Sequence, residues 1–213
     1  MQQRRSTGRS DDQAETPAVA YEIIVVGTSW GGLAALRTVI DALPTEFDIP
    51  VAVVQHRHRD SDAMLAQFLQ QHTRLRVCEI EDKQVIEPGR IFIAPANYHT
   101  LVEEGHFSLS TEAPVRYSRP SIDVAMTSAA DSYAHRAVGV VLTGANADGA
   151  EGLRRIADSG GMTVVQEPAT AEVDTMPLAA LRWVPTARVF ALDRIAAFLG
   201  ALPSARGQAP KSA

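Results

Sequence analysis

The feature of this sequence that most restricts its fold is the alternation of short apolar runs with amphipathic helical patterns. YEIIVVG (21–27), IPVAVVQH (49–56) and AVGVVLTG (137–144) are rich in β-branched residues and lack the polar alternation of a half-exposed strand. Between such runs lie segments like GGLAALRTVIDAL (31–43), in which apolar residues recur every three or four positions. The pattern predicts an α/β fold with a doubly wound, mostly parallel sheet flanked by helices.

The 213 residues suit one domain, which we place at residues 20–202. A polar leader at 1–19 and a tail at 203–213 have no periodic apolar pattern and are predicted to be disordered. Short runs separated by Pro95 and Gly105 predict a small antiparallel excursion around residues 88–110.

Charge and cysteine content narrow the classes of function. Twenty basic and 25 acidic side chains give a net charge of −5, which argues against binding to nucleic acid or to an anionic membrane surface. No apolar stretch is long enough to span a bilayer, and no secretory signal is visible. Cys78 is the one cysteine, which fits a reducing compartment, and its apolar surroundings predict an inert packing residue. We therefore expect a cytoplasmic protein with no direct membrane insertion.

The loops that follow the buried strands are where a site is expected, because ligands of such sheets bind at the carboxyl ends of the strands. The first loop, Gly27-Thr28-Ser29-Trp30-Gly31, matches G-x-S-x-G, the strand-to-helix turn that presents a nucleophilic serine. The helix N-terminus behind it would favour a developing negative charge. A phosphate-cradling turn or simple glycine-rich packing is the alternative.

Two further loops offer partners for this serine. A serine hydroxyl needs a base, and His56 ends the next buried strand. The base needs a carboxylate, and Asp148 follows the strand that ends near Leu142. Asp148 could also cap the helix that begins near Gly149. The chain order Ser29, His56, Asp148 differs from that of ordinary α/β-hydrolases.

A metal site is the rival interpretation of the second loop. His56, His58 and Asp60 form H-x-H-x-D, which resembles the start of the metal-binding motif of metallo-β-lactamase-like hydrolases. That motif should continue with histidine, but Ser61 stands there, and the remaining histidines do not obviously complete a ligand set. A metal-dependent hydrolase stays an alternative, with His58 otherwise an exposed residue.

Taken together, several segments resemble the catalytic domain of CheB chemotaxis methylesterases. The resemblance runs from about Tyr21 to Leu202 and keeps the order and spacing of the family's motifs. Its segments are VVGTSWGGLAAL (25–36), VVQHRHRD (53–60), IFIAPANYHTLV (91–102), YSRPSIDV (117–124), VGVVLTGANADGAEG (138–152) and VDTMPLAAL (173–181).

The resemblance implies hydrolysis of γ-glutamyl methyl esters on methyl-accepting chemotaxis receptors, with release of methanol, and often deamidation of receptor glutamines. It implies the catalytic triad Ser29, His56 and Asp148, and no metal or organic cofactor. The oxyanion donors would be main-chain N–H groups, first of Trp30 and then near Ala145. A direct substrate contact by Arg119 is a further hypothesis.

Other family positions are expected to be structural. Pro120, Ser121 and Asp123 suit the start of a helix, and His99 is expected to support the site rather than to react.

Departures from the family pattern leave alternatives open. Many CheB proteins carry an amino-terminal receiver domain, whereas about 20 residues precede the first strand here, so a separate regulatory protein is considered as a partner. Trp30 stands where threonine is common, and 145–147 where a Met-Gly pair is frequent. A receptor-binding module with a weak or silent site and a general small-ester hydrolase are the remaining alternatives.

Overall fold

The protein is described by a computed structural model that covers residues 19–57 and 64–205. In these ranges seven parallel strands form the main sheet, in the order β3-β4-β2-β1-β7-β8-β9. This confirms the predicted parallel α/β architecture. The strands are β1 (Ile23–Thr28), β2 (Val51–Gln55), β3 (Arg76–Glu79), β4 (Arg90–Ile93), β7 (Ala137–Val141), β8 (Met162–Gln166) and β9 (Arg188–Phe190).

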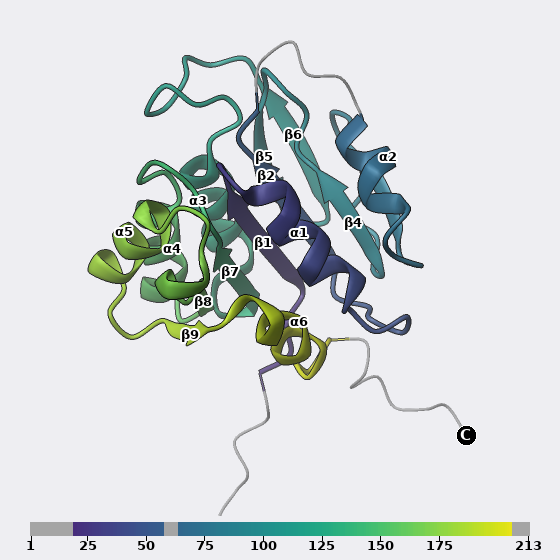
Figure 1. Cartoon of the computed structure of the whole chain (residues 1–213). Coiled ribbons are helices and arrows are strands. Elements are labelled where there is room, and N and C mark those ends of the chain that lie inside the picture. The colour runs from purple at the N-terminus through teal and green to yellow at the C-terminus, as the bar shows by residue number, and fades with distance from the viewer. Residues whose placement is uncertain (1–18, 58–63, 206–213) are drawn as a thin grey trace, which may run out of the picture.

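Helices cover both faces of this sheet (Figure 1). Ile24 and Val26 of β1 pack toward α1, α2 and α6, whereas Ile23 and Val25 pack toward the opposite layer. Each of these side chains is fully or almost fully buried, which stabilises the fold by about 1.5 to 3 kcal/mol per residue. The first layer is α1 (Gly32–Asp41), α2 (Met64–Gln70) and α6 (Leu192–Gly200); the second is α3 (Ile122–Tyr133), α4 (Ala150–Asp158), α5 (Thr175–Trp183) and the β5–β6 hairpin (His99–Glu103, His106–Ser110). Short 3₁₀ turns lie at Ala134–Arg136 and Pro168–Thr170.

The antiparallel excursion is smaller than its predicted range. The hairpin of β5 and β6 is antiparallel, as expected. Arg90–Ile93 is instead a parallel strand that lies between β3 and β2. No helix separates β3 from β4, so the usual strand-helix-strand alternation that marks a parallel strand is missing from this part of the sequence. Arg188–Phe190 is a further strand that the sequence pattern did not predict.

The strand order places three loops at one edge of the sheet. β1 pairs with β2 on one side and with β7 on the other, so the chain winds outward in two directions from β1. The loops after β1, β2 and β7 therefore meet at the topological switch point, where ligands of such sheets bind.

The two ends of the described chain lie beside each other. Tyr21 N–H donates to the Pro203 carbonyl at 2.8 Å, and the Ser204 hydroxyl donates to Asp48 Oδ2 at 2.7 Å. Residues 203–205 of the predicted tail are thus held against the domain, while the leader up to residue 18 and residues 206–213 lie outside the described ranges. Within those ranges no helix is both long and apolar enough to cross a bilayer.

Candidate active site

The loop after β1 has the tight geometry expected of G-x-S-x-G. Gly27 has no room for a side chain, because a Cβ there would lie 2.3 Å from Ile122 Cγ2 of α3. Gly31 precedes α1 with φ of 77°, a left-handed conformation that favours glycine. Between them Ser29 leaves the strand, with its N–H donating to the Thr143 carbonyl at 3.0 Å. The predicted turn therefore presents Ser29 at the carboxyl edge of the sheet.

His56 lies next to this loop because β2 runs beside β1. Thr28 and Gln55 are paired in the parallel register, and the His56 N–H donates to the Thr28 carbonyl at 3.0 Å. Ser29 directly follows β1 and His56 directly follows the neighbouring strand β2, so their backbones are adjacent although 26 residues separate them in sequence.

Asp148 reaches His56 from the loop after β7. His56 Nε2 is 2.7 Å from Asp148 Oδ2, and the Asp148 side chain is fully buried. An ionised carboxylate only accepts hydrogen bonds, so Nε2 is the ring nitrogen that donates its N–H to Asp148. His56 Nδ1 is then the nitrogen left to accept a proton. Asn146 Nδ2 lies 3.4 Å from this Nδ1, with its own Oδ1 accepting the Asp148 N–H at 3.1 Å.

The Asp148 carboxylate is also held by the start of α3. Oδ2 accepts the Ile122 N–H at 2.7 Å, and Oδ1 accepts the Ser121 hydroxyl at 2.9 Å and the Asp123 N–H at 3.0 Å. Burial would raise the pKa of Asp148, but the hydrogen bonds from His56, Ile122 and Asp123 outweigh it and lower the pKa from its ordinary value. Asp148 is therefore ionised and oriented. Its carboxylate thus accepts N–H groups from the first turn of α3 and none from the start of α4 at Gly149, where the sequence predicted it to act as a cap.

Asp123 makes the reciprocal contact from α3 to α4. Its Oδ1 accepts the N–H groups of Gly149 and Gly152, each at 2.8 Å. Its Oδ2 is buried and accepts no hydrogen bond from the described residues, with Arg116 Nε 3.3 Å away. Burial raises the pKa of Asp123 to about 6, helped by the charge of Asp148 and opposed by the Gly152 N–H. Of the two neighbouring carboxyl groups, Asp123 is the one that takes up a proton first.

The Ser29 hydroxyl and the two predicted oxyanion donors share one feature: none of them is hydrogen-bonded to a described residue. Its hydroxyl makes no hydrogen bond with any residue of the described ranges, so the expected hydroxyl–imidazole bond is not formed here. The N–H groups of Trp30 and Ala145 likewise donate to no described residue. They are the two groups that the sequence predicts as oxyanion donors. Because Ser29 Cβ lies close to Gly144, where a Cβ would approach it to 3.0 Å, the Ala145 loop borders the serine.

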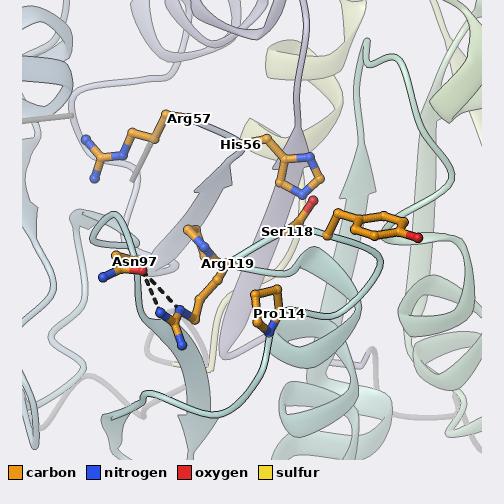
Figure 2. Close-up of a pocket in the computed structure, with 8 residues that line it drawn as sticks. His56, Arg57, Asn97, Pro114, Ser118 and Arg119 are labelled. Atoms are coloured by element: carbon orange, nitrogen blue, oxygen red, sulfur yellow. Dashed lines mark hydrogen bonds between the residues drawn. The ribbon is translucent and has the colours of Figure 1, made fainter. Parts of the chain in front are cut away.

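A cavity of about 650 Å³ opens beside His56. Figure 2 shows the Arg119 guanidinium on its wall turned toward Asn97 and away from His56. Arg119 Nη2 donates to Asn97 Oδ1 at 2.6 Å, and Nη1 donates to the Thr111 and Glu112 carbonyls. These hydrogen bonds connect Arg119 to both sides of the loop that borders the cavity. A direct contact between Arg119 and substrate stays a prediction. The lining residues are His56, Arg57, Asn97, Pro114, Tyr117, Ser118, Arg119 and Pro120.

The other candidate residues lie around this centre. The Trp30 side chain is 66% exposed, and its Nε1 donates to Glu172 Oε1 at 3.1 Å. His99 is buried, and its Nδ1 accepts the Ser121 N–H at 3.2 Å, so it supports the residue that donates to Asp148. Cys78 is half-buried on the edge strand β3, away from the three loops. His58 and Asp60 of the alternative metal motif lie outside the described residues.

The sequence did not predict that Ser121 and Asp123 would take part in the site. Both were assigned to helix initiation, and Ser121 is indeed the N-cap of α3, where its hydroxyl accepts the Val124 N–H. Their contacts with the Asp148 loop depend on α3 and α4 starting side by side. The one signal in the sequence was an acidic residue, Asp123, in the first turn of a predicted helix, and such a residue alone does not indicate a functional site.

Comparison with known proteins decides what kind of protein carries this site. The family profile described as CheB methylesterase matches residues 24–199. The chain belongs to the CheB methylesterase family. The match confirms the resemblance found in the sequence and the predicted enzyme class, a methylesterase-type hydrolase.

Individual CheB-type relatives agree with this assignment. A protein of Leptospira interrogans that is named "putative protein-glutamate methylesterase/protein-glutamine glutaminase" is 43% identical over 177 residues, which are 83% of this chain and 92% of that protein. The protein-glutamate methylesterase FrzG of Myxococcus xanthus is 38% identical over 86% of this chain, which spans 55% of the length of FrzG. The crystal structure of the Thermotoga maritima CheB methylesterase catalytic domain superposes with a TM-score of 0.81 and 30% identity, covering 85% of this chain and 98% of that domain.

Proposed function

We propose that this protein hydrolyses γ-glutamyl methyl esters on methyl-accepting chemotaxis receptors by a Ser29-His56-Asp148 triad, releasing methanol. The observation that carries the proposal is the 2.7 Å contact between His56 Nε2 and a buried, fully hydrogen-bonded Asp148 at the edge where Ser29 leaves β1. The names of the relatives, protein-glutamate methylesterase and protein-glutamine glutaminase, support the reaction class.

In the first half-reaction Ser29 Oγ attacks the ester carbonyl while His56 Nδ1 takes the hydroxyl proton. Asp148 stabilises the imidazolium through Nε2–H. The carbonyl oxygen becomes an oxyanion, for which the N–H groups of Trp30 and Ala145, which donate to no described residue, are the proposed donors. Collapse of the tetrahedral intermediate breaks the bond to methoxide, which leaves as methanol with the proton from His56.

In the second half-reaction water replaces the serine. His56 Nδ1 accepts a proton from water as its oxygen attacks the acyl carbon, and Ser29 leaves with the proton that returns. The product is a glutamate carboxylate. A receptor glutamine would form the same acyl-enzyme with ammonia as leaving group, so we include deamidation in the proposal.

The loop that precedes Arg119 and the exposed Trp30 border the site, and we propose that the receptor's cytoplasmic helical region binds across them. The rival metal mechanism would use His56 as a ligand. The bond from its Nε2 to Asp148 is compatible with both mechanisms, so the chelator and the Ser29→Ala variant separate them.

Methanol release from methylated receptor membranes tests the proposal. We expect wild type to release methanol with or without a chelator, and Ser29→Ala and His56→Ala to lose nearly all activity. Loss of activity with chelator and its retention in Ser29→Ala would favour the metal alternative. Receptor binding without methanol release would favour a silent module, and a large preference for free small esters would favour a general esterase.

A further inference from the structure

The Gln55 side chain joins the backbones of the two residues proposed as nucleophile and base. Its Nε2 donates to the Ser29 carbonyl at 2.8 Å and to the His56 carbonyl at 3.1 Å. Both partners are acceptors, so the amide nitrogen and not the oxygen must face them. One carboxamide therefore connects the ends of β1 and β2 at the point where both catalytic side chains leave the sheet.

The first of these bonds also fixes the orientation of an oxyanion donor. The Ser29 carbonyl and the Trp30 N–H belong to one peptide unit, and in a trans peptide they point in opposite directions. Gln55 Nε2 and the Gly32 N–H, at 2.8 and 3.0 Å, hold that carbonyl on the protein side. The Trp30 N–H is thereby turned outward, and it donates to no described residue.

The chain leaves space for this amide at a defined place. A Cβ on Gly32 would lie 2.3 Å from Gln55 Oε1 and 2.6 Å from Thr28 Oγ1, so only glycine lets the carboxamide lie flat against the start of α1. Gln55 Oε1 is buried and accepts no hydrogen bond from the described residues. The amide is thus held in one orientation, with its nitrogen on the two carbonyls and its oxygen against Gly32 at the start of α1.

We infer that Gln55 is a positioning residue for the proposed esterase reaction, holding the Trp30 N–H toward the oxyanion and the His56 backbone beside Ser29. The inference rests on the proposed function. Since an oxyanion exists only in the transition state and the intermediates, loss of Gln55 lowers kcat and leaves KM nearly unchanged.

Gln55→Met tests this, with Gln70→Met as matched control. Gln70 Nε2 also donates to two backbone carbonyls, those of Thr73 and Leu75, but at the end of α2 away from the three loops. We expect Gln55→Met to lower kcat for methanol release about 10- to 100-fold, with KM within about twofold. The control should change melting temperature alone.

Labelling of Ser29 by a fluorophosphonate probe gives a second readout that needs no receptor. The serine oxygen bonds to phosphorus, fluoride leaves, the hydroxyl proton passes to His56, and the phosphoryl oxygen occupies the oxyanion position. The labelling rate of Gln55→Met should fall by a similar factor. Gly32→Ala, which displaces the amide from the other side, should do the same, and the double variant should be little slower than either single one.

The possible failures are distinguishable. If wild type is not labelled, or is labelled equally after Ser29→Ala, the proposed function fails and this inference with it. If wild type is labelled at Ser29 but folded Gln55→Met and Gly32→Ala react at the wild-type rate, the positioning role is wrong while the esterase stands. A rise in KM with unchanged kcat would also overturn it.

Discussion

Asp123 and Asp148 make reciprocal contacts between the starts of two helices. Asp123 belongs to the first turn of α3 and accepts N–H groups from the start of α4, whereas Asp148 precedes α4 and accepts N–H groups from the start of α3. Asp148, just before α4, accepts from Ile122 and Asp123 of α3 at 2.7 and 3.0 Å, and Asp123 accepts from Gly149 and Gly152 at 2.8 Å each. The positive end of each helix dipole thus faces a carboxylate. The proposed triad carboxylate is therefore part of the joint between two helices, and its orientation depends on both.

This joint predicts how stability depends on pH. The pKa of Asp123 is about 6, above its ordinary value of 3.8, so the folded state binds the proton more tightly than the unfolded state. The free energy of unfolding therefore loses about 3 kcal/mol from this group as pH rises from about 4 to 7. Asp123→Asn keeps an acceptor for Gly149 and Gly152 but does not titrate. Its stability relative to wild type should rise by that amount over the same range in urea titrations, and a difference that stays flat with pH would contradict the assignment.

Replacing Asp148 should reduce both activity and stability. Asp148→Asn can leave the wrong imidazole tautomer facing Ser29, and we expect kcat to fall about 10⁴-fold. Asp148→Ala leaves the donors of Ser121, Ile122 and Asp123 without their acceptor, which should cost about 2 to 4 kcal/mol of unfolding free energy. Ser29→Ala is the control, because its hydroxyl bonds to no described residue and its stability should change by less than about 0.5 kcal/mol. Equal destabilisation of the two alanine variants would contradict the capping role.

The Trp30 indole, unlike the main-chain N–H of the same residue, should act on receptor binding and not on chemistry. Its indole is 66% exposed beside the nucleophile, so Trp30→Ala should leave the melting temperature nearly unchanged. We expect KM for methylated receptor to rise about 5- to 30-fold and kcat/KM for a small methyl ester to stay constant. Trp183→Ala, which removes a 46% exposed indole from the end of α5, is the matched control. A parallel loss on both substrates would instead place the Trp30 indole in the reaction itself.

Arg119 and Asn97 should behave as one unit. Because Asn97 Oδ1 accepts from both Nε and Nη2 of Arg119, removing either side chain loosens the same loop. We expect Asn97→Ala to raise KM for receptor about threefold and Arg119→Met, which also removes the bonds to the Thr111 and Glu112 carbonyls, about 3- to 10-fold, with a double variant no worse than Arg119→Met. A rise in KM well beyond tenfold for Arg119→Met, with little effect of Asn97→Ala, would support a direct contact between Arg119 and substrate.

The parts of the fold that the sequence predicts are those with a strong local pattern. The continuous apolar run before Gly27 and the periodic segment after Gly31 define β1 and α1 without tertiary information. Arg188–Phe190 has three residues and no apolar alternation, so its pairing with β8 depends on the neighbouring strand. Arg90–Ile93 was misassigned because its parallel crossover contains no helix.

The same distinction applies to the site. Ser29, His56 and Asp148 each follow a recognisable buried strand, so topology alone places them at one edge. The role of Asp123 depends on where α3 begins relative to α4, and that of Gln55 on the strand register that sets its amide between two carbonyls. These roles come from tertiary contacts, for which a single sequence carries no pattern.

Trapping the covalent intermediate tests the central mechanism most directly. A receptor peptide that carries one glutamyl methyl ester is mixed with the enzyme, quenched with acid within milliseconds, and analysed by mass spectrometry. We predict an adduct equal to the peptide minus methanol on the fragment that contains Ser29, and none in Ser29→Ala. Methanol formed at the wild-type rate by Ser29→Ala, or an adduct on another residue, would contradict the proposed nucleophile.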